Sequence, residues 1–472
     1  MKQIIYQLLP RLWGSGKFSS VDTRSLEYFK GLGVDYLWFT GIIRHASASS
    51  QEKVVKGEAG SPYAITDYYD VNPYMADVPQ RRMEEFEDLI RRTHEAGLRC
   101  IIDFVPNHVA REYKGTLGTG DDKNVHWAPE NDFFYYPGQA LHLPLNPKGY
   151  EEVPARASGN CFTATPDIND WWETVKINYC DFHTGTWDKM RDIVRFWAAK
   201  GVDGFRCDMV ELVPPQFMQW LIQSIKAEFP HLIFVAEVYE KAKYRMYVDE
   251  VGFDFLYDKC GLYDTLRAVT CSGASARGIS WNWQFLGSLQ PHMLNFLENH
   301  DEQRVASDFF CARADGAYAA LAVSLLLNTA PFMLYFGQEA GERGMQQEGY
   351  SGLDGRTSIF DWCAVPALTA PDKAVLERYR AALSLSKETA FAVGKTFDLC
   401  YCQDGSFNPD RHFTWLRSDG AHTFLVVSNF GDTADISVRI PVEALDYLGI
   451  KAVRTVYTVT VQTHDYSVIR VD

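Results

Sequence analysis

Basic residues are in the minority in this sequence, with 46 lysines and arginines against 61 aspartates and glutamates. The formal net charge is therefore -15 at pH 7. Nucleic acids and anionic membrane surfaces attract proteins through basic patches, so neither is the expected partner. A neutral ligand fits this charge balance better. The sequence indicates no oligomeric state.

Long apolar runs are also missing. No stretch reaches the roughly eighteen apolar residues that a membrane-spanning helix needs. The N-terminal segment MKQIIYQLLPRLWGSG has too short and too polar an apolar stretch for a secretory signal peptide. We therefore expect a soluble, cytoplasmic protein without a membrane partner. A signal peptide removed beforehand would leave no trace in this chain.

Cysteines with ligand or disulfide spacing are lacking too. The ten cysteines stand singly, apart from Cys400 and Cys402, and no CxxC or Cys/His ligand spacing is present. Several lie inside apolar, strand-like runs. This usage predicts reduced core residues of a cytosolic protein rather than a disulfide framework.

Aromatic residues, in contrast, are abundant, with 12 Trp, 25 Tyr and 29 Phe in 472 residues. Most of them are expected in the core of a chain that is long enough for several domains. Aromatic rings also stack on the apolar faces of sugar rings. A carbohydrate is therefore one neutral ligand that this composition suits.

Strand-like runs alternate with amphipathic helical stretches through the first three quarters of the sequence. The segment 81–97, for example, puts Met83, Phe86, Leu89 and Ile90 on one helical face, ends at Gly97, and leads into the run LRCIIDFV. Such alternation indicates a parallel sheet covered by helices. An open doubly wound sheet would also fit, but about eight strands with charged residues at their carboxyl ends favour a (β/α)8 barrel.

Two stretches depart from the alternation. The connection from His108 to about Val175 is rich in Gly, Pro and aromatic residues and predicts a small inserted domain after the third strand. From about residue 388 the period becomes two, and Asp419-Gly420 predicts a hairpin. We therefore expect a barrel over 1–108 and 176–387, an inserted domain over 109–175, and a C-terminal antiparallel β-sandwich over 388–472.

Charged residues gather at the ends of the predicted strands. In VDGFRCDM, alternation turns Arg206 and Asp208 to the same side of the strand at its carboxyl end. The other predicted strand ends carry Asp103, Asn107, His108, Glu237, His300 and Asp301. Because the carboxyl ends of barrel strands meet on one face, these side chains are expected to share one site.

Carboxylates that converge in one pocket can cut a glycosidic bond. One attacks or stabilises the anomeric carbon while another donates a proton to the leaving oxygen. Salt-bridged rim residues or a divalent-metal site would also explain any single carboxylate. Their joint arrival at strand ends favours the catalytic interpretation.

Four short motifs, DFVPNH, GFRCD, VAEV and ENHD, resemble the four characteristic regions of the α-amylase family of retaining glycoside hydrolases, in order and in strand position. Further stretches, IYQLLPR, GVDYLWFTGI, SPYAITDYYDVNP, TPDIN and YFGQEAG, extend the resemblance over nearly the whole chain. The resemblance implies cleavage of α-1,4-glucosidic bonds in starch-type glucans or malto-oligosaccharides.

The resemblance also implies roles for individual residues. Asp208 would be the nucleophile, Glu237 the general acid and then the base, and Asp301 the residue that stabilises the transition state. The implied substrate-binding residues are Tyr63, His108, Arg206 and His300. Tyr239, Trp281 and Trp283 are weaker candidates for neighbouring sugar sites, and a structural role is the favoured alternative for them.

The sequence departs from the family at its calcium site. Asn107 and Asp167 match two ligand positions, but Leu212, preceded by Glu211, stands where many members have a histidine. Leucine offers no side-chain oxygen, and hard cations need several oxygen ligands. We therefore expect no metal and no cofactor, with calcium near Asn107 and Asp167 as the lesser alternative.

Three other functions stay open at this stage. An α-glucanotransferase or an α-glucosidase would use the same catalytic residues, because they share the glycosyl-enzyme intermediate. The motifs leave the linkage, the chain-length preference and the choice between endo and exo action undecided. A non-catalytic carbohydrate-binding barrel is disfavoured, since binding alone would not need three carboxylates and an arginine.

Overall fold

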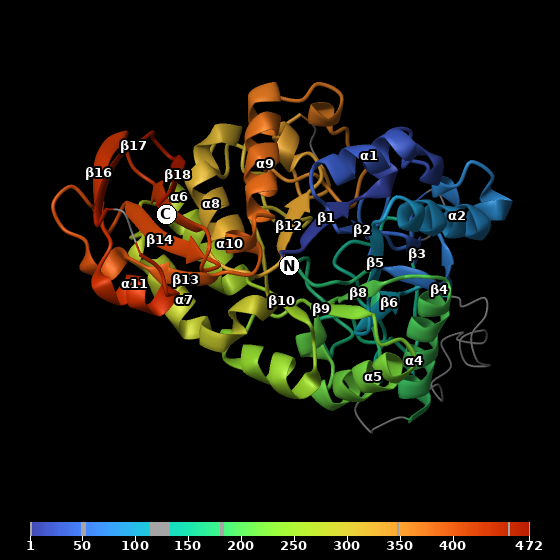
Figure 1. The fold of residues 1–472 in the computed structure, drawn as a ribbon. Helices are drawn as coiled ribbons and strands as arrows, with labels where there is room; N and C mark the ends of the chain where they lie inside the picture. The colour runs from blue at the N-terminus through green and yellow to red at the C-terminus, as the bar shows by residue number, and fades with distance from the viewer. Residues whose placement is uncertain are drawn as a thin grey trace.

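The computed structural model describes residues 2–48, 53–113, 133–179, 184–346, 349–451 and 454–471. Eight parallel strands close into a barrel, and antiparallel sheets follow it in the C-terminal part of the chain (Figure 1). Around the barrel the order is β1-β2-β5-β8-β9-β10-β11-β12, and β12 pairs with β1. This arrangement confirms the predicted barrel and the predicted C-terminal β domain.

The barrel strands are short and buried almost without interruption, as expected for strands packed on both faces. They are β1 (Ile4–Leu8), β2 (Tyr36–Phe39), β5 (Arg99–Phe104), β8 (Gly204–Cys207), β9 (Ile233–Ala236), β10 (Phe255–Tyr257), β11 (Met293–Phe296) and β12 (Phe332–Tyr335). Two-stranded pairs outside the barrel are β3 (Ile43–His45) with β4 (Ile65–Val71) and β6 (His108–Ala110) with β7 (Thr174–Lys176).

Helices cover the outside of the barrel. They are α1 (Thr23–Gly31), α2 (Arg82–Glu95), α4 (Thr184–Ala199), α5 (Pro215–Glu228), α6 (Asp264–Cys271), α7 (Arg277–Leu286), α8 (Tyr318–Leu326) and α9 (Lys373–Ser386). The apolar face predicted for α2 is confirmed, with Phe86, Leu89 and Ile90 buried and Met83 partly buried. Helix α1 begins after Asp22, whose side chain accepts a hydrogen bond from the backbone of Ser25.

The strand β10 is not predicted by any periodicity in the sequence. It has three residues and lies between two π-helical turns, Met246–Val251 and Lys259–Tyr263. Three residues are too few to show an alternating pattern, and the irregular turns hide the helical period on both sides. Barrel closure, rather than local sequence, therefore makes this segment a strand.

An aspartate stands immediately before three of the barrel strands and joins each to the strand beside it. Its carboxylate accepts a backbone N–H from that neighbour: Asp35 from Ile4, Asp203 from Cys100, and Asp254 from Phe234. Each carboxylate also lies 2.6 to 2.8 Å from a basic side chain, namely Lys387, His94 and Lys226 respectively. Asp203, the first charged residue of the motif VDGFRCD, therefore has a structural role.

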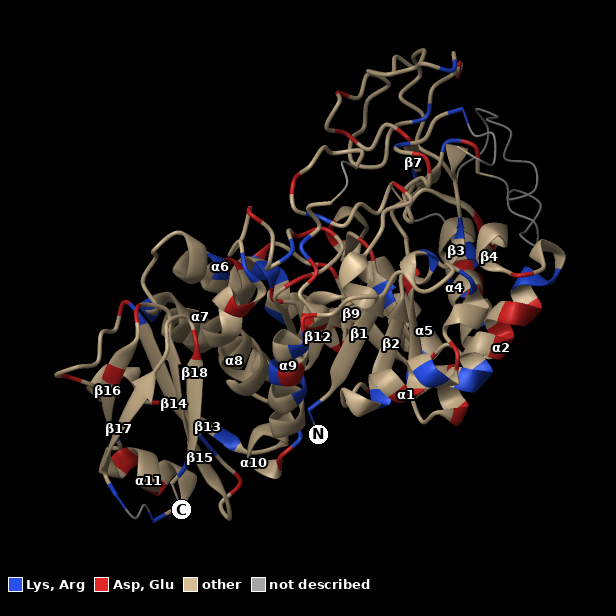
Figure 2. Ribbon diagram, turned by 90° about the horizontal axis from the view of Figure 1, so that it is seen from above, with Lys and Arg blue, Asp and Glu red and all other residues tan. Residues whose placement is uncertain are grey.

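The predicted inserted domain lies between β6 and β7, above one end of the barrel (Figure 2). Much of its glycine-rich part, residues 114–132, lies outside the described residues, as does Cys180. The antiparallel pairing of β6 with β7 brings the two ends of this segment together. Its boundaries at residues 109 and 175 stay predictions.

The C-terminal domain has a four-stranded sheet of β13 (Lys395–Asp398), β14 (His412–Ser418), β15 (Thr423–Asn429) and β18 (Tyr466–Arg470). A second sheet pairs β16 (Ala434–Arg439) with β17 (Val456–Val461), and two short helices, α10 (Thr389–Ala392) and α11 (Val442–Leu448), complete the domain. The hairpin predicted at Asp419-Gly420 is confirmed by the pairing of β14 with β15. The domain has its own apolar core and lies beside α7 and α8 (Figure 1).

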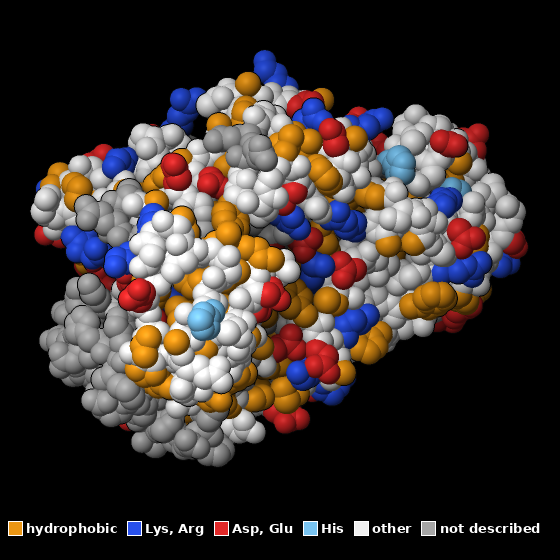
Figure 3. Space-filling view, turned by 180° about the vertical axis from the view of Figure 1, so that it is seen from behind, with side chains coloured by type: hydrophobic (Ala, Val, Ile, Leu, Met, Phe, Trp, Pro, Cys, Tyr) orange, Lys and Arg blue, Asp and Glu red, His pale blue; other side chains and the backbone are white. Residues whose placement is uncertain are grey.

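The surface carries a mixture of charges. On the face that Figure 3 shows, acidic and basic side chains are interspersed with apolar ones and form no continuous basic band. Among the described residues, no helix has the length and apolar character needed to cross a lipid bilayer.

Candidate active site

The three carboxylates predicted as catalytic lie in one cavity of about 430 Å³. Asp208 directly follows β8, Glu237 directly follows β9, and Asp301 lies in the loop after β11. Since β8 and β9 are parallel neighbours, their carboxyl ends stand side by side. Barrel geometry thus gathers residues that are far apart in the chain onto one face.

The predicted substrate-binding residues lie at the same place. Tyr63, His108 and His300 line the cavity together with the carboxylates, and Arg206 lies beneath them. Tyr63 comes from the loop before β4, and His108 begins β6. The structure therefore brings together all seven predicted residues, and their individual roles stay predictions.

Arg206 connects two of the carboxylates. Its Nη1 lies 2.6 Å from Oδ1 of Asp208, and its Nη2 lies 2.8 Å from Oε1 of Glu237. The side chain is only 1% exposed, and the rings of Trp38, Tyr63 and Tyr257 lie 5.3 to 5.6 Å from the guanidinium carbon. A charge buried among aromatic rings is costly unless it is paired, so the two carboxylates and the arginine stabilise one another.

The surroundings shift the pKa values of two carboxyl groups in opposite directions. Burial raises the pKa of Asp208; the Arg206 guanidinium opposes that shift, whereas the nearby Glu237 adds to it. Burial also acts to raise the pKa of Asp301, but the neighbouring His300 and Arg206 outweigh it and hold this pKa below its usual value. Ionisation of Asp208 therefore depends on Arg206.

Two donors besides Arg206 orient Glu237. The Tyr239 hydroxyl donates to Oε1 at 2.7 Å, and the backbone N–H of Met209 donates to Oε2 at 2.9 Å. Met209 has a φ of 42°, in the left-handed region that non-glycine residues rarely adopt. This turn, one residue after Asp208, directs the Met209 N–H toward Glu237. Tyr239, one of the weaker candidates from the sequence, also lines the cavity.

The two predicted histidines are buried and paired. Burial, together with Lys176 and Arg206, lowers the pKa of His108 to about 3, so its imidazole is neutral near pH 7. Nε2 of His108 lies 3.9 Å from Asp208, and Nε2 of His300 lies 2.6 Å from the Tyr63 hydroxyl and 3.1 Å from Asp301. Both imidazoles can hydrogen-bond to a hydroxyl of a bound sugar.

Other residues of the cavity are not predicted by the motifs. Lys56 and Glu173 form an ion pair of 3.0 Å in its wall, and the Trp171 ring lies 5.1 Å from the ring of His108. In the sequence, the Trp171-Trp172 pair near the end of the inserted stretch could have indicated an aromatic residue in the cavity. The ion pair joins two loops more than a hundred residues apart, and nothing local indicates it.

A lysine takes the place where the resemblance put metal ligands. Nζ of Lys176 donates to Oδ1 of Asn107 and, at 3.3 Å, to the carbonyl oxygen of Leu212. Asp167 is exposed and caps its own loop, and Glu211 accepts the backbone N–H of a neighbouring loop. Since Lys176 is only 4% exposed and its ammonium would repel a cation, these residues do not fit calcium.

Sequence similarity to known proteins agrees with this geometry. A family model described as the alpha amylase catalytic domain matches residues 14–361. Alpha-amylase 3 of Dictyoglomus thermophilum is 25% identical over 334 residues, covering 69% of this chain and 60% of that protein. Alpha-1,4-glucan:maltose-1-phosphate maltosyltransferase of Cereibacter sphaeroides is 26% identical over 295 residues, covering 56% and 37%. The chain thus spans less than two thirds of each of these relatives.

Solved structures show the same fold. The cyclic α-maltosyl-(1→6)-maltose hydrolase from Arthrobacter globiformis, in complex with its cyclic substrate, matches with a TM-score of 0.73. The match covers 99% of this chain and 98% of that one, at 18% sequence identity. At this identity the likeness concerns the fold alone.

Proposed function

The chain belongs to the α-amylase family, and from this premise we propose that it is a retaining glycoside hydrolase acting on α-1,4-linked glucans. Starch-type chains and malto-oligosaccharides are the substrates. The observation that carries the proposal is the guanidinium of Arg206, which contacts both Asp208 and Glu237 beneath a cavity that also holds Asp301.

The reaction proceeds in two steps. In the first, a carboxylate oxygen of Asp208 bonds to the anomeric carbon while Glu237 donates its proton to the leaving glycosidic oxygen. In the second, Glu237 removes a proton from water, and the resulting hydroxide breaks the ester and frees Asp208. Asp301, which stays ionised because its pKa is low, stabilises positive charge on the sugar ring.

A glucanotransferase is the main alternative within the same chemistry. There a sugar hydroxyl replaces water in the second step, and the similarity to a maltosyltransferase gives this possibility weight. A barrel that only binds carbohydrate is disfavoured, because burying Asp208, Glu237 and Arg206 together has a desolvation cost that binding alone does not require.

Product analysis on maltoheptaose separates these functions. Endo-hydrolysis yields a mixture of shorter maltodextrins, an exo-acting α-glucosidase releases glucose, and disproportionation yields chains longer than seven units. If no product forms from either maltoheptaose or soluble starch, the proposal is wrong.

The stereochemical course is a prediction of its own. Because displacement by Asp208 and then by water inverts the anomeric centre twice, the first product should be the α-anomer. Proton NMR of freshly released reducing ends, recorded before mutarotation, measures it. A β-anomer appearing first would show direct attack by water and would make Asp208 a base.

We also propose that the enzyme needs no calcium, because Lys176 supplies the positive charge between Asn107 and Leu212. Activity should survive exhaustive treatment with EDTA with little change in Tm. Lys176→Ala should lower the free energy of unfolding by about 1.5 to 3 kcal/mol, since it leaves buried acceptors without a charged donor. Lys451→Ala, on the surface, is the control. Inactivation by EDTA that calcium reverses would contradict this proposal.

A further inference from the structure

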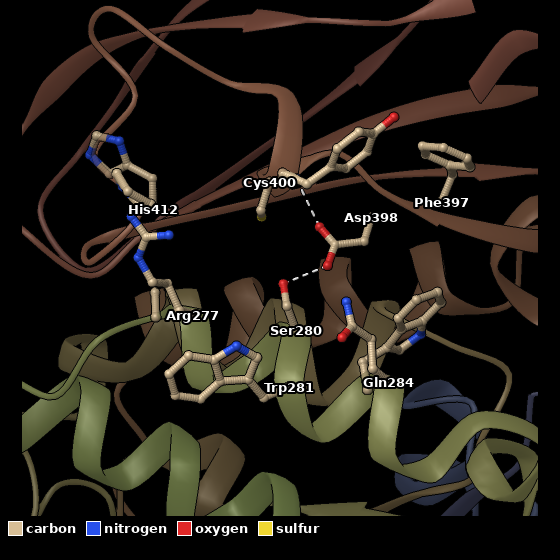
Figure 4. A pocket seen from close by; sticks show the side chains of 12 residues that line it. Arg277, Ser280, Trp281, Gln284, Phe397, Asp398, Cys400 and His412 are labelled. Atoms are coloured by element: carbon tan, nitrogen blue, oxygen red, sulfur yellow. Dashed lines mark hydrogen bonds between the residues drawn. The ribbon is translucent and has the colours of Figure 1, made fainter. Parts of the chain in front are cut away.

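A second cavity, of about 360 Å³, lies between α7 and the C-terminal domain (Figure 4). Helix α7 provides one wall, with Ser280 and Gln284 directed toward the other domain and Trp281 alongside the helix. Phe397 and Asp398 stand on the opposite wall. Its lining shares no residue with that of the catalytic cavity. Trp281 and Trp283, two of the weaker candidates from the sequence, therefore lie here and not beside the carboxylates.

Aromatic rings are unusually exposed at this cavity. Trp281 is 66% exposed and Tyr401 is 63% exposed. Tyr401, Phe397 and Tyr447 follow one another along the C-terminal domain, with ring centroids 6.3 and 5.6 Å apart. Packing of the fold does not require large rings in solvent, so their presence beside a cavity points to a ligand with flat apolar faces.

A buried histidine in the same cavity has a donor without a partner. His412 is 5% exposed, and its Nδ1 accepts the backbone N–H of Asn408 at 2.9 Å. Burial lowers the pKa of His412, so the neutral ring carries its proton on Nε2. Nothing in the described part of the chain accepts that proton, although His412 lines the cavity. The cavity thus presents a hydrogen-bond donor to whatever occupies it.

The charged groups of the cavity are already paired. Asp398 accepts hydrogen bonds from the Ser280 hydroxyl and from the backbone of Cys400 (Figure 4). Arg277 lies 3.6 Å from Asp410. Since neither charge needs a counter-ion, the occupant that fits is uncharged and carries hydroxyl groups rather than phosphate or carboxylate.

The cavity continues as a groove along α7. A second hollow, of about 550 Å³, shares Trp283 and Gln284 with it and extends to Arg417 and Tyr447. An elongated groove with aromatic rings at intervals suits a chain of linked sugar rings better than a single small molecule.

We propose that this groove, from Trp281 and Tyr401 to Tyr447, is a second binding site for an α-glucan chain. The proposal rests on the proposed function for the identity of the sugar. Trp281 and Tyr401 stack on pyranose rings, and His412 donates to a hydroxyl between them. A polymer held here stays attached to the enzyme, which raises the local concentration of its other segments around the catalytic cavity.

Calorimetric titration with maltoheptaose tests the site in the Glu237→Gln background, where the ligand is not consumed. The parent should show two classes of site. Trp281→Ala and Tyr401→Ala should each weaken one class about tenfold or more, the usual effect of removing an aromatic anchor. Phe285→Ala is the matched control, because Phe285 is 53% exposed one turn further along α7 but does not line the cavity.

Kinetics on the active enzyme separates this site from the catalytic one. Trp281→Ala should slow hydrolysis of soluble starch several-fold and leave kcat/KM for a maltotrioside unchanged. A single class of site in the parent, or binding that Trp281→Ala and Phe285→Ala change equally, would overturn the groove proposal. If the wild-type chain cleaves maltoheptaose in that case, the proposed function stands without it. Tm values confirm that each variant is folded.

Discussion

Asp208→Asn and Glu237→Gln should each lower turnover of maltoheptaose by about 10³-fold or more. The first removes the oxygen that bonds to the anomeric carbon, and the second removes the proton that the leaving oxygen needs. Both substitutions keep the size of the side chain, and in each variant Arg206 keeps the carboxyl group that is not substituted as a partner. Initial rates from reducing-sugar release, compared with the wild type, measure the loss.

The control for this experiment lies on the same stretch of chain. Asp203 stands at the opposite end of β8 and pairs with His94, far from the cavity lining. Asp203→Asn should lower Tm but keep turnover within a few-fold of the wild type. If Asp208→Asn or Glu237→Gln retained most of the activity on malto-oligosaccharides, the assigned roles would be wrong.

Arg206→Leu should reduce turnover by about 10²-fold or more at neutral pH and displace the pH profile. Burial raises the pKa of Asp208 and Arg206 opposes that rise, so removing the guanidinium lets the pKa climb further. A nucleophile is active only when ionised, that is, above its pKa. The acid limb of the kcat/KM profile should therefore move to higher pH.

Arg206→Lys is the informative comparison. It keeps a positive charge but loses the forked geometry that contacts Asp208 and Glu237 at once. Its acid limb should move less than that of Arg206→Leu, while both variants lose turnover. An acid limb that stays in place in Arg206→Leu would mean that Asp208 does not depend on this arginine.

Features written in short stretches of sequence could be predicted. The strand β8, the helix α2 and the hairpin at Asp419 have local periodicity or turn residues, and the structure confirms them. The convergence of the carboxylates could be predicted because Asp208 and Glu237 directly follow recognisable strands and Asp301 lies in the loop after another. The strand β10 could not, since closure of the barrel imposes its conformation.

Local sequence patterns could not predict contacts between distant segments. The pair of Lys56 with Glu173, for example, depends on how two loops fold over the cavity. In the sequence, Lys176 stands out weakly, as a charged residue inside the short strand-like run TVKI. Buried lysines are rare and usually paired, but the sequence does not show that its partners are Asn107 and Leu212.

The aspartates that precede β2, β8 and β10 separate the structural carboxylates of this barrel from the carboxylates predicted as catalytic. They lie at the amino ends of the strands, where they join neighbours, whereas Asp208 and Glu237 lie at the carboxyl ends. Substitutions in the first set are therefore expected to change stability, and substitutions in the second to change activity. Stability and catalysis can therefore be altered separately, by substitutions at opposite ends of the barrel strands.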